Sequence, residues 1–269
     1  EHTLFIAVSQ SGETLDTLQS LRDAKRKGAG VLSIVNVVGS SVARESDDLL
    51  YTWAGPEIGV ASTKAYTTQL TAFYLLALYL GKMNGRLDED KYKEVVLGLK
   101  ELPEMISKVL AKSPEIQKLA AAQFNNEKVF FMGRGMDCDI AYEASLKLKE
   151  ISYINSFAIA AGELKHGTIA LIEEDTFVVA IATQDHLFEK MVSNIKEVKA
   201  RGAHVFAVAK EGNDQLMKSA DEVFYIPACM DALTPILSVV PTQLFAFYVS
   251  ALRGNDVDKP RNLAKSVTV

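Results

Sequence analysis

The sequence predicts an α/β fold that occurs twice in tandem, each copy a mostly parallel sheet flanked by helices on both faces, followed by an irregular C-terminal tail. Short apolar runs alternate with longer amphipathic segments, which is the pattern of strands and helices in a parallel sheet. The apolar runs end at loops and contain few polar residues, as strands buried on both faces do. A constant shift along the chain also superimposes its two halves.

This repeat holds through strands and helices without a gap. The shift that carries Thr68-Gln69-Leu70 onto Thr242-Gln243-Leu244 also carries Gly28 onto Gly202. One shift that fits such distant segments is hard to obtain by chance, so we interpret the chain as two copies of one fold.

The first copy begins with a strand predicted at Leu4–Val8, and Gly28 is expected to end its first helix because glycine readily adopts the left-handed conformation found there. Its further elements are predicted, in order, as a helix at Glu13–Lys27, a strand at Val31–Val37, a short helix at Ser41–Ser46, a strand at Leu49–Thr52 and a helix at Ser62–Leu80.

The second copy is predicted to contain the same series of elements. Its strands are expected at Val129–Met132, Phe177–Ile181, Val205–Ala209 and Glu222–Ile226, and its helices at Ile140–Ser152, before Arg201 and at Pro235–Leu252. Between the copies, Asp88–Ala111 predicts one or two amphipathic helices interrupted at Pro103, and a further helix is expected near Pro114–Ala122.

The strand and helix at the front of the second copy have no counterpart in the first. The repeat places their equivalents before residue 1, so we expect the first domain to be truncated at its N-terminus. We expect the first domain at residues 1–100, the second at 101–255 and the tail at 256–269.

Composition narrows the class of protein. Apolar residues make up 48%, charged residues 23%, and the net charge is -5, which argues against a nucleic-acid-binding surface. Cys138 and Cys229 lie far apart and form no disulfide pattern, which fits the reducing cytoplasm. The longest apolar run, Leu70–Leu80, is too short to span a bilayer and is expected to be a buried helix.

The segment Ser9-Gln10-Ser11-Gly12-Glu13-Thr14 follows a predicted strand and opens a helix. A helix N-terminus supplies backbone N–H groups and positive potential, and the three hydroxyls add further donors for a phosphate ester. The alternative is a helix cap without a ligand, because Ser and Thr are common there. In the second copy Asp185 replaces Ser11 and would repel phosphate, so we expect only the first copy to bind it.

Three further positions are candidates for chemistry. Lys147 and Glu150 share a helix face, although an ordinary solvated ion pair is the alternative. His166 lies in a loop-like stretch and can act as an acid or base near neutral pH; an incidental surface histidine is the alternative, and the absence of partners makes a zinc site improbable. The tail carries Lys265 and is expected to dock, with a frayed terminus as the alternative.

At these residues the chain resembles the sugar isomerase (SIS) family, and within it the double-SIS isomerase half of the glutamine–fructose-6-phosphate aminotransferases. Thr168 departs from the family pattern, which often has Pro at this position. The matching motifs are Ser9–Thr14, Glu57–Ala65, Leu146–Tyr153, Gly162–Gly167 and Arg261–Val269.

The resemblance implies how the substrate is bound and converted. The implied substrate contacts are Ser9, Gln10, Ser11 and Thr14 for the phosphate, and Val60, Ser62 and Ala264 for the sugar. Glu150 is implied as the base that moves a proton between C1 and C2, and Lys147 as its assistant. His166 is implied in ring opening, from the other subunit of a homodimer, and Lys265 in an imine with the ketone, with the tail closing over the sugar.

The implied reaction converts fructose 6-phosphate and ammonia into glucosamine 6-phosphate without a metal or organic cofactor. A glutaminase domain is expected upstream, and neither cysteine of this chain stands in a context to replace its nucleophile. The alternatives are another SIS isomerase, a fructosamine-6-phosphate deglycase, or a non-catalytic sugar-phosphate sensor. A sensor needs the Ser/Thr loop but has no use for Glu150, His166 and Lys265 together.

Overall fold

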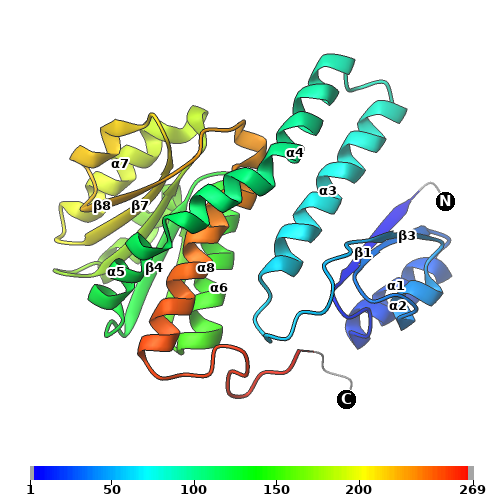
Figure 1. Ribbon diagram of the computed structural model, residues 1–269, viewed down its shortest axis with the longest axis horizontal. Coiled ribbons are helices and arrows are strands. Elements are labelled where there is room, and N and C mark those ends of the chain that lie inside the picture. The colour runs from blue at the N-terminus through cyan, green and yellow to red at the C-terminus, as the bar shows by residue number, and fades with distance from the viewer. Residues whose placement is uncertain (1–2, 266–269) are drawn as a thin grey trace. The chain divides into compact units, whose positions relative to one another are not determined.

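The computed structural model describes residues 3–265 and divides the chain into two compact units (Figure 1). Unit 1 comprises Glu1–Glu94 together with Arg261–Val269, and unit 2 comprises Val95–Pro260. Residues 266–269, which belong to the tail motif, lie outside the described part of the chain.

Unit 1 contains a three-stranded parallel sheet in the order β1-β2-β3. Buried side chains of helix α1 pack on this sheet, with Leu21, Val35 and Val42 fully enclosed in the shared core. The elements are β1 (Leu4–Ser9), α1 (Leu15–Arg26), β2 (Gly30–Val35), α2 (Ser41–Glu45), β3 (Asp48–Tyr51) and α3 (Lys64–Met83).

Helix α3 corrects the prediction that Leu70–Leu80 is a buried helix. Ala72 and Leu76 are buried, but Leu75 is 48% exposed and Tyr79 is 61% exposed. The segment is apolar on every side, while only the face that packs within the chain leaves solvent. Composition gave the element type correctly and its burial incorrectly.

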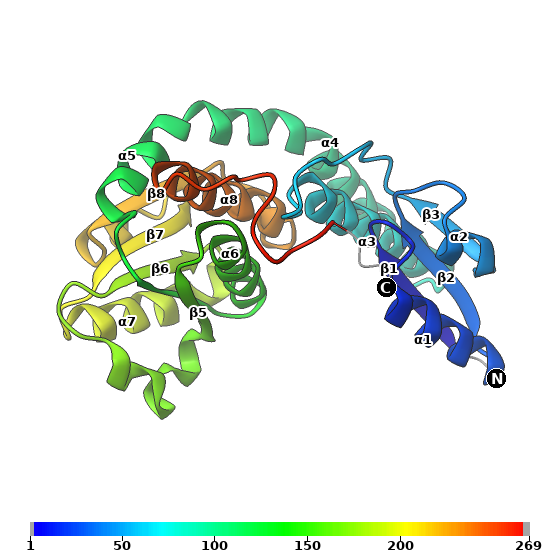
Figure 2. The same cartoon turned by 90° about the horizontal axis from the view of Figure 1, so that it is seen from below.

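Unit 2 contains a five-stranded parallel sheet in the order β5-β4-β6-β7-β8. Helix α7 covers one side of it, and α5 and α8 cover the other (Figure 2). The elements are α4 (Glu89–Ala111, which begins in unit 1), α5 (Ser113–Gln123), β4 (Lys128–Gly133), α6 (Met136–Ser152), β5 (Asn155–Ala160), β6 (Phe177–Ala182), α7 (Phe188–Lys199), β7 (His204–Lys210), β8 (Glu222–Ile226) and α8 (Thr234–Leu252).

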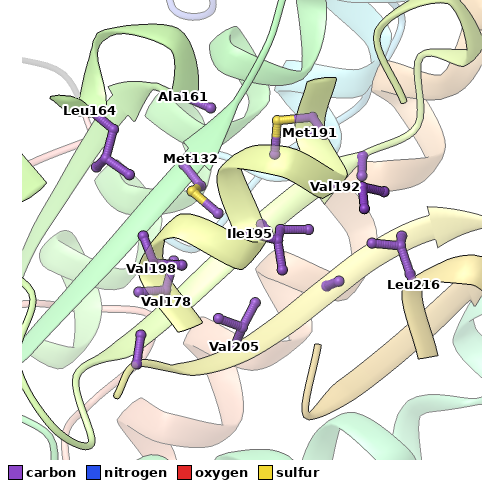
Figure 3. Packing of buried hydrophobic residues seen from close by; sticks show 14 of the residues in the cluster. Met132, Ala161, Leu164, Val178, Met191, Val192, Ile195, Val198, Val205 and Leu216 are labelled. Atoms are coloured by element: carbon purple, nitrogen blue, oxygen red, sulfur yellow. The ribbon is translucent and has the colours of Figure 1, made fainter. Parts of the chain in front are cut away.

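The core of unit 2 lies on both faces of this sheet. Met191, Ile195 and Val198 of α7 pack against Val178 and Val205 of the strands (Figure 3). On the other face α8 packs against α6 and α5. Helix α8 is long and apolar enough to cross a membrane, but 72% of its most apolar window is buried, as in the core helix of a soluble protein.

The predicted elements are all present, and the structure adds three features. Strand β5 pairs with β4 at the edge of the sheet, where no strand was expected. The loop-like stretch that carries His166 is a 3-10 helix, Ala161–His166, and a second one follows at Thr168–Leu171. Helix α4 continues through Pro103, although the sequence left one or two helices open.

Candidate active site

The loop between β1 and α1 is held in shape by its own hydroxyls. The backbone N–H of Gly12 donates to Ser9 Oγ at 3.0 Å, and that of Glu13 donates to Ser11 Oγ at 3.2 Å. Gly12 has a φ of 67°, and a Cβ at this position would overlap the side chain of Ser40. Only glycine satisfies both constraints, so this residue fixes the path of the loop into α1.

Capping does not account for all the hydroxyls of this loop. Thr14 occupies the N-cap position of α1 with an extended backbone, yet its side chain forms no capping hydrogen bond. Its Oγ1 lies 3.4 Å from Ser9 Oγ, and the buried Gln10 Oε1 has no hydrogen-bond partner in the described part of the chain. The loop therefore keeps polar groups available at the positive end of a helix, where an anion is stabilised.

The same edge of the sheet connects this loop to the segment after β3. Asn36, which follows β2, donates its backbone N–H to Gln10 O at 3.4 Å. Its Oδ1 accepts from Thr52 Oγ1 at 3.1 Å and from Ala54 N at 2.8 Å. Because the carboxyl ends of parallel strands form the ligand edge of such a sheet, these contacts place both loops at the expected site.

Lys265 reaches the segment that follows. Its Nζ lies 2.8 Å from Gly59 O, and 3.4 Å from both Val60 O and Ser62 Oγ. It is 2.5 Å from Glu57 Oε2. The tail thus docks through its lysine, while Leu263 and Ala264 are exposed. Within unit 1, the structure brings together three of the predicted residues, Val60, Ser62 and Lys265.

In unit 2, one face of α6 carries a buried charged cluster. Lys147 Nζ lies 2.7 Å from Glu150 Oε2 and 3.5 Å from Glu143 Oε1. The side chain of Lys147 is only 6% exposed, so the alternative of a solvated surface pair is wrong. Burial raises the pKa of Glu143, with a further contribution from the negative charge of Glu150, while Lys147 opposes both. An ammonium between two carboxylates can steady a base through a proton transfer.

His166 stands apart from this cluster within the described chain. It is exposed at the end of its 3-10 helix, and none of the hydrogen bonds or ion pairs found among residues 3–265 involves it. The structure therefore joins Lys147 with Glu150 but leaves the predicted role of His166 as a prediction.

The corresponding loop of the second copy is already filled by protein groups. Asp137 accepts hydrogen bonds from Thr183 N at 2.6 Å, from Thr183 Oγ1 at 2.5 Å and from Gln184 N at 3.3 Å. Asp185 pairs with the buried Lys210 at 2.6 Å. Carboxylates of the chain thus occupy the donors that an external anion would need.

Two residues of these clusters were not singled out from the sequence. Glu57 lies in a motif that the sequence highlighted, but nothing near it in the sequence indicates its contact with Lys265, more than 200 residues away in the chain. Glu143 precedes Lys147 by one helical turn, and this spacing alone could have identified it.

Comparisons with known proteins place both clusters in a common context. The SIS domain model matches residues 1–79 and 124–253. The glutamine–fructose-6-phosphate aminotransferase of Caldanaerobacter subterraneus subsp. tengcongensis is 59% identical over 269 residues, and that of Clostridium tetani is 56% identical over 267. These matches cover 100% and 99% of this chain but only 44% of either relative.

A solved structure gives the same result in three dimensions. The C-terminal domain of glucosamine-fructose-6-phosphate aminotransferase from Francisella tularensis superimposes with a TM-score of 0.91 at 39% identity. The match covers 96% of this chain and 72% of that one. The chain therefore belongs to the SIS domain family, in the branch represented by the C-terminal domains of the glutamine–fructose-6-phosphate aminotransferases.

Proposed function

We propose that this chain is the isomerase portion of an enzyme that converts fructose 6-phosphate and ammonia into glucosamine 6-phosphate. The observation that carries the proposal is the buried Lys147–Glu150 pair in a chain whose other unit offers a hydroxyl-lined helix N-terminus. The names of the relatives support the same reaction, and the chain corresponds to less than half of their length.

The phosphate of the sugar binds to Ser9, Gln10, Ser11 and Thr14 in this proposal. The hydroxyl of Thr14 is uncommitted to capping, and the loop carries no lysine, so neutral donors and the helix end provide the binding energy. A monoester on a small metabolite suits such a site. The sugar hydroxyls contact Ser62, the backbone of Val60 and the exposed Ala264.

The reaction begins with opening of the sugar ring by His166, which acts from the other subunit of a homodimer. Its exposure at the end of a 3-10 helix suits a residue that serves a neighbouring site. Lys265 then forms an imine with the C2 ketone, and ammonia replaces the lysine. This exchange needs no metal or organic cofactor.

Glu150 carries out the proton shift that turns the ketose imine into an amino aldose. It takes the proton from C1 and returns it to C2, and Lys147 at 2.7 Å stabilises its anionic form between the two steps. One carboxylate on one face of the substrate is sufficient for this transfer.

The remaining parts of the proposal concern the whole protein. A glutaminase domain supplies ammonia from upstream, the protein is a cytoplasmic homodimer, and the two SIS domains correspond to residues 1–100 and 101–255. The tail, residues 256–269, closes over the sugar site.

The test is Glu150→Gln in the full-length protein, assayed for glucosamine 6-phosphate with ammonium chloride as nitrogen donor. We expect turnover to fall by at least about a hundredfold, as for loss of a general base, while the affinity for fructose 6-phosphate changes only a few-fold. Turnover at the unsubstituted rate would refute the proposed function.

A further inference from the structure

We propose that Glu57 is the proton acceptor that prepares Lys265 for imine formation, an inference that rests on the function proposed above. Lys265 Nζ contacts four groups in the described chain, and Glu57 Oε2 at 2.5 Å is the nearest. The other three are two backbone carbonyls and the hydroxyl of Ser62. Glu57 alone among them is a base near neutral pH.

The carboxylate of Glu57 is held rigidly in place. Its side chain is 6% exposed, and its Oε1 accepts hydrogen bonds from Thr63 N at 2.9 Å and from Ala65 N at 3.3 Å. These donors belong to the start of α3, whose positive end favours an anion. One oxygen is thus fixed to the scaffold while the other faces the lysine.

Charge state follows from these contacts. Burial by itself would raise the pKa of Glu57, but the hydrogen bond from Lys265 and those from Thr63 and Ala65 outweigh it, so the pKa lies below its usual value. Glu57 is therefore a carboxylate at neutral pH, and its partner is held as an ammonium. An ammonium has no lone pair and cannot attack a ketone.

Lys265 is nevertheless already at the sugar-binding segment. Its Nζ lies 2.8 Å from Gly59 O and 3.4 Å from Val60 O, next to residues proposed to contact the sugar. Only a proton has to move before the nitrogen can react. Desolvation by the arriving sugar weakens the charged pair relative to the neutral one and promotes that transfer.

The proposed step balances in atoms and charge. Glu57 takes one proton from the Lys265 ammonium, and the freed lone pair forms the C–N bond to C2 of the open-chain ketose. Glu57 passes this proton, and then a second one taken from the same nitrogen, to the former ketone oxygen. The C–O bond breaks and water leaves, so one ammonium and one ketone yield one iminium and one water, with the carboxylate restored.

A purely structural role for Glu57 is separable from this one. The variant Glu57→Gln keeps an oxygen that accepts from Thr63 N and Ala65 N but cannot take up a proton. Glu57→Asp keeps the base on a shorter side chain. As a matched control, Glu45→Gln removes an exposed carboxylate of the same unit, whose partner is Arg22.

The experiment traps the imine in the full-length protein. Fructose 6-phosphate and sodium cyanoborohydride are added at a series of pH values, and mass spectrometry follows reductive labelling of the peptide that contains Lys265. We expect Glu57→Gln to be labelled about a hundredfold more slowly at pH 7. Its rate should rise roughly tenfold per pH unit, because the free amine then has to come from a lysine that titrates near about 10.4.

The controls define the remaining outcomes. Unsubstituted protein and Glu45→Gln should be labelled equally, with a shallower pH dependence, and Glu57→Asp should recover part of the rate. Equal or faster labelling of Glu57→Gln at pH 7 would overturn the role of Glu57. No labelling of Lys265 in the unsubstituted protein would instead refute its proposed imine, a failure that leaves the Glu150 test unaffected.

Discussion

Lys147 Nζ lies 2.7 Å from Glu150 Oε2 on a side chain that is 6% exposed, so α6 carries a buried ammonium whose charge is matched locally. Taking such a group out of water is costly, and the free energy is recovered only while its carboxylate partners remain in place. A helix that needed only stability would be better served by an apolar residue here. The pair is therefore best explained by chemistry.

Removal of this ammonium should destabilise unit 2. Lys147→Met leaves Glu143 and Glu150 facing each other without a cation, and we expect a loss of about 3–5 kcal/mol in the free energy of unfolding. Urea unfolding followed by circular dichroism measures it. Lys149→Met, at an exposed position of the same helix, is the control and should change stability by less than about 0.5 kcal/mol. Equal effects of the two substitutions would contradict the buried pair.

The glycine of the phosphate loop should be far less replaceable than another glycine with a similar backbone. Gly12 has a φ of 67° and no room for a Cβ, whereas Gly28 has a φ of 82° and nothing within 4 Å. We expect Gly12→Ala to cost more than about 1 kcal/mol beyond Gly28→Ala. Thermal unfolding and calorimetry with fructose 6-phosphate test this, and only Gly12→Ala should weaken binding. Similar behaviour of both variants would count against the loop geometry.

Thr14 and Ser11 should separate ligand binding from capping. Thr14→Ala removes a hydroxyl that forms no capping bond, so stability should stay within about 0.5 kcal/mol while affinity for the phosphate ester falls. We expect a decrease of about tenfold or more, because a hydrogen bond to a charged group contributes about 1.5–3 kcal/mol. Ser11→Ala should reduce both quantities, since Ser11 Oγ also accepts from Glu13 N. Unchanged affinity in Thr14→Ala would refute the phosphate assignment.

The buried carboxyl of the second loop should make stability depend on pH. Burial raises the pKa of Asp137, although hydrogen bonds from Thr183 and Gln184 oppose it. Between its ordinary pKa of about 3.9 and this raised value, the folded chain holds a proton that the unfolded chain has released. The free energy of unfolding should therefore fall as pH rises through this window, by at most about 1.4 kcal/mol per unit from this group.

Asp137→Asn provides the comparison for that pH dependence. The variant has no titrating group at this position, so its unfolding free energy should lack the slope between pH 4 and the raised pKa of the native carboxyl. Urea titrations at several pH values measure the difference between the two proteins. Parallel pH profiles would contradict a raised pKa for Asp137.

Local patterns of the sequence were sufficient for most of the fold. Buried strands such as β6 are short apolar runs, and the repeat fixed the equivalence of their loops. Strand β5 was not predicted because Asn155–Ala160 mixes polar and apolar residues at the sheet edge, where burial imposes little pattern. The exposure of α3 could not be predicted either, since composition gives the hydrophobicity of a helix but not which neighbours cover it.

The site divides in the same way. The phosphate loop and the Lys147–Glu150 pair are local in the sequence, so spacing and chemistry identified them. The contact between Lys265 and Glu57 joins the end of the chain to its first third and depends on tertiary structure alone. Resemblance to a family indicated the lysine, but only coordinates indicate its base.

The most direct test of the account is hydrogen exchange at the substrate carbon. Full-length protein and its Glu150→Gln variant are incubated with fructose 6-phosphate and ammonium ions in D2O, and NMR follows deuterium incorporation at C1 and C2. We predict incorporation with the unsubstituted protein and at least about a hundredfold less with the variant, at similar sugar affinity. Equal incorporation by both proteins would show that another residue moves the proton and would contradict the central claim.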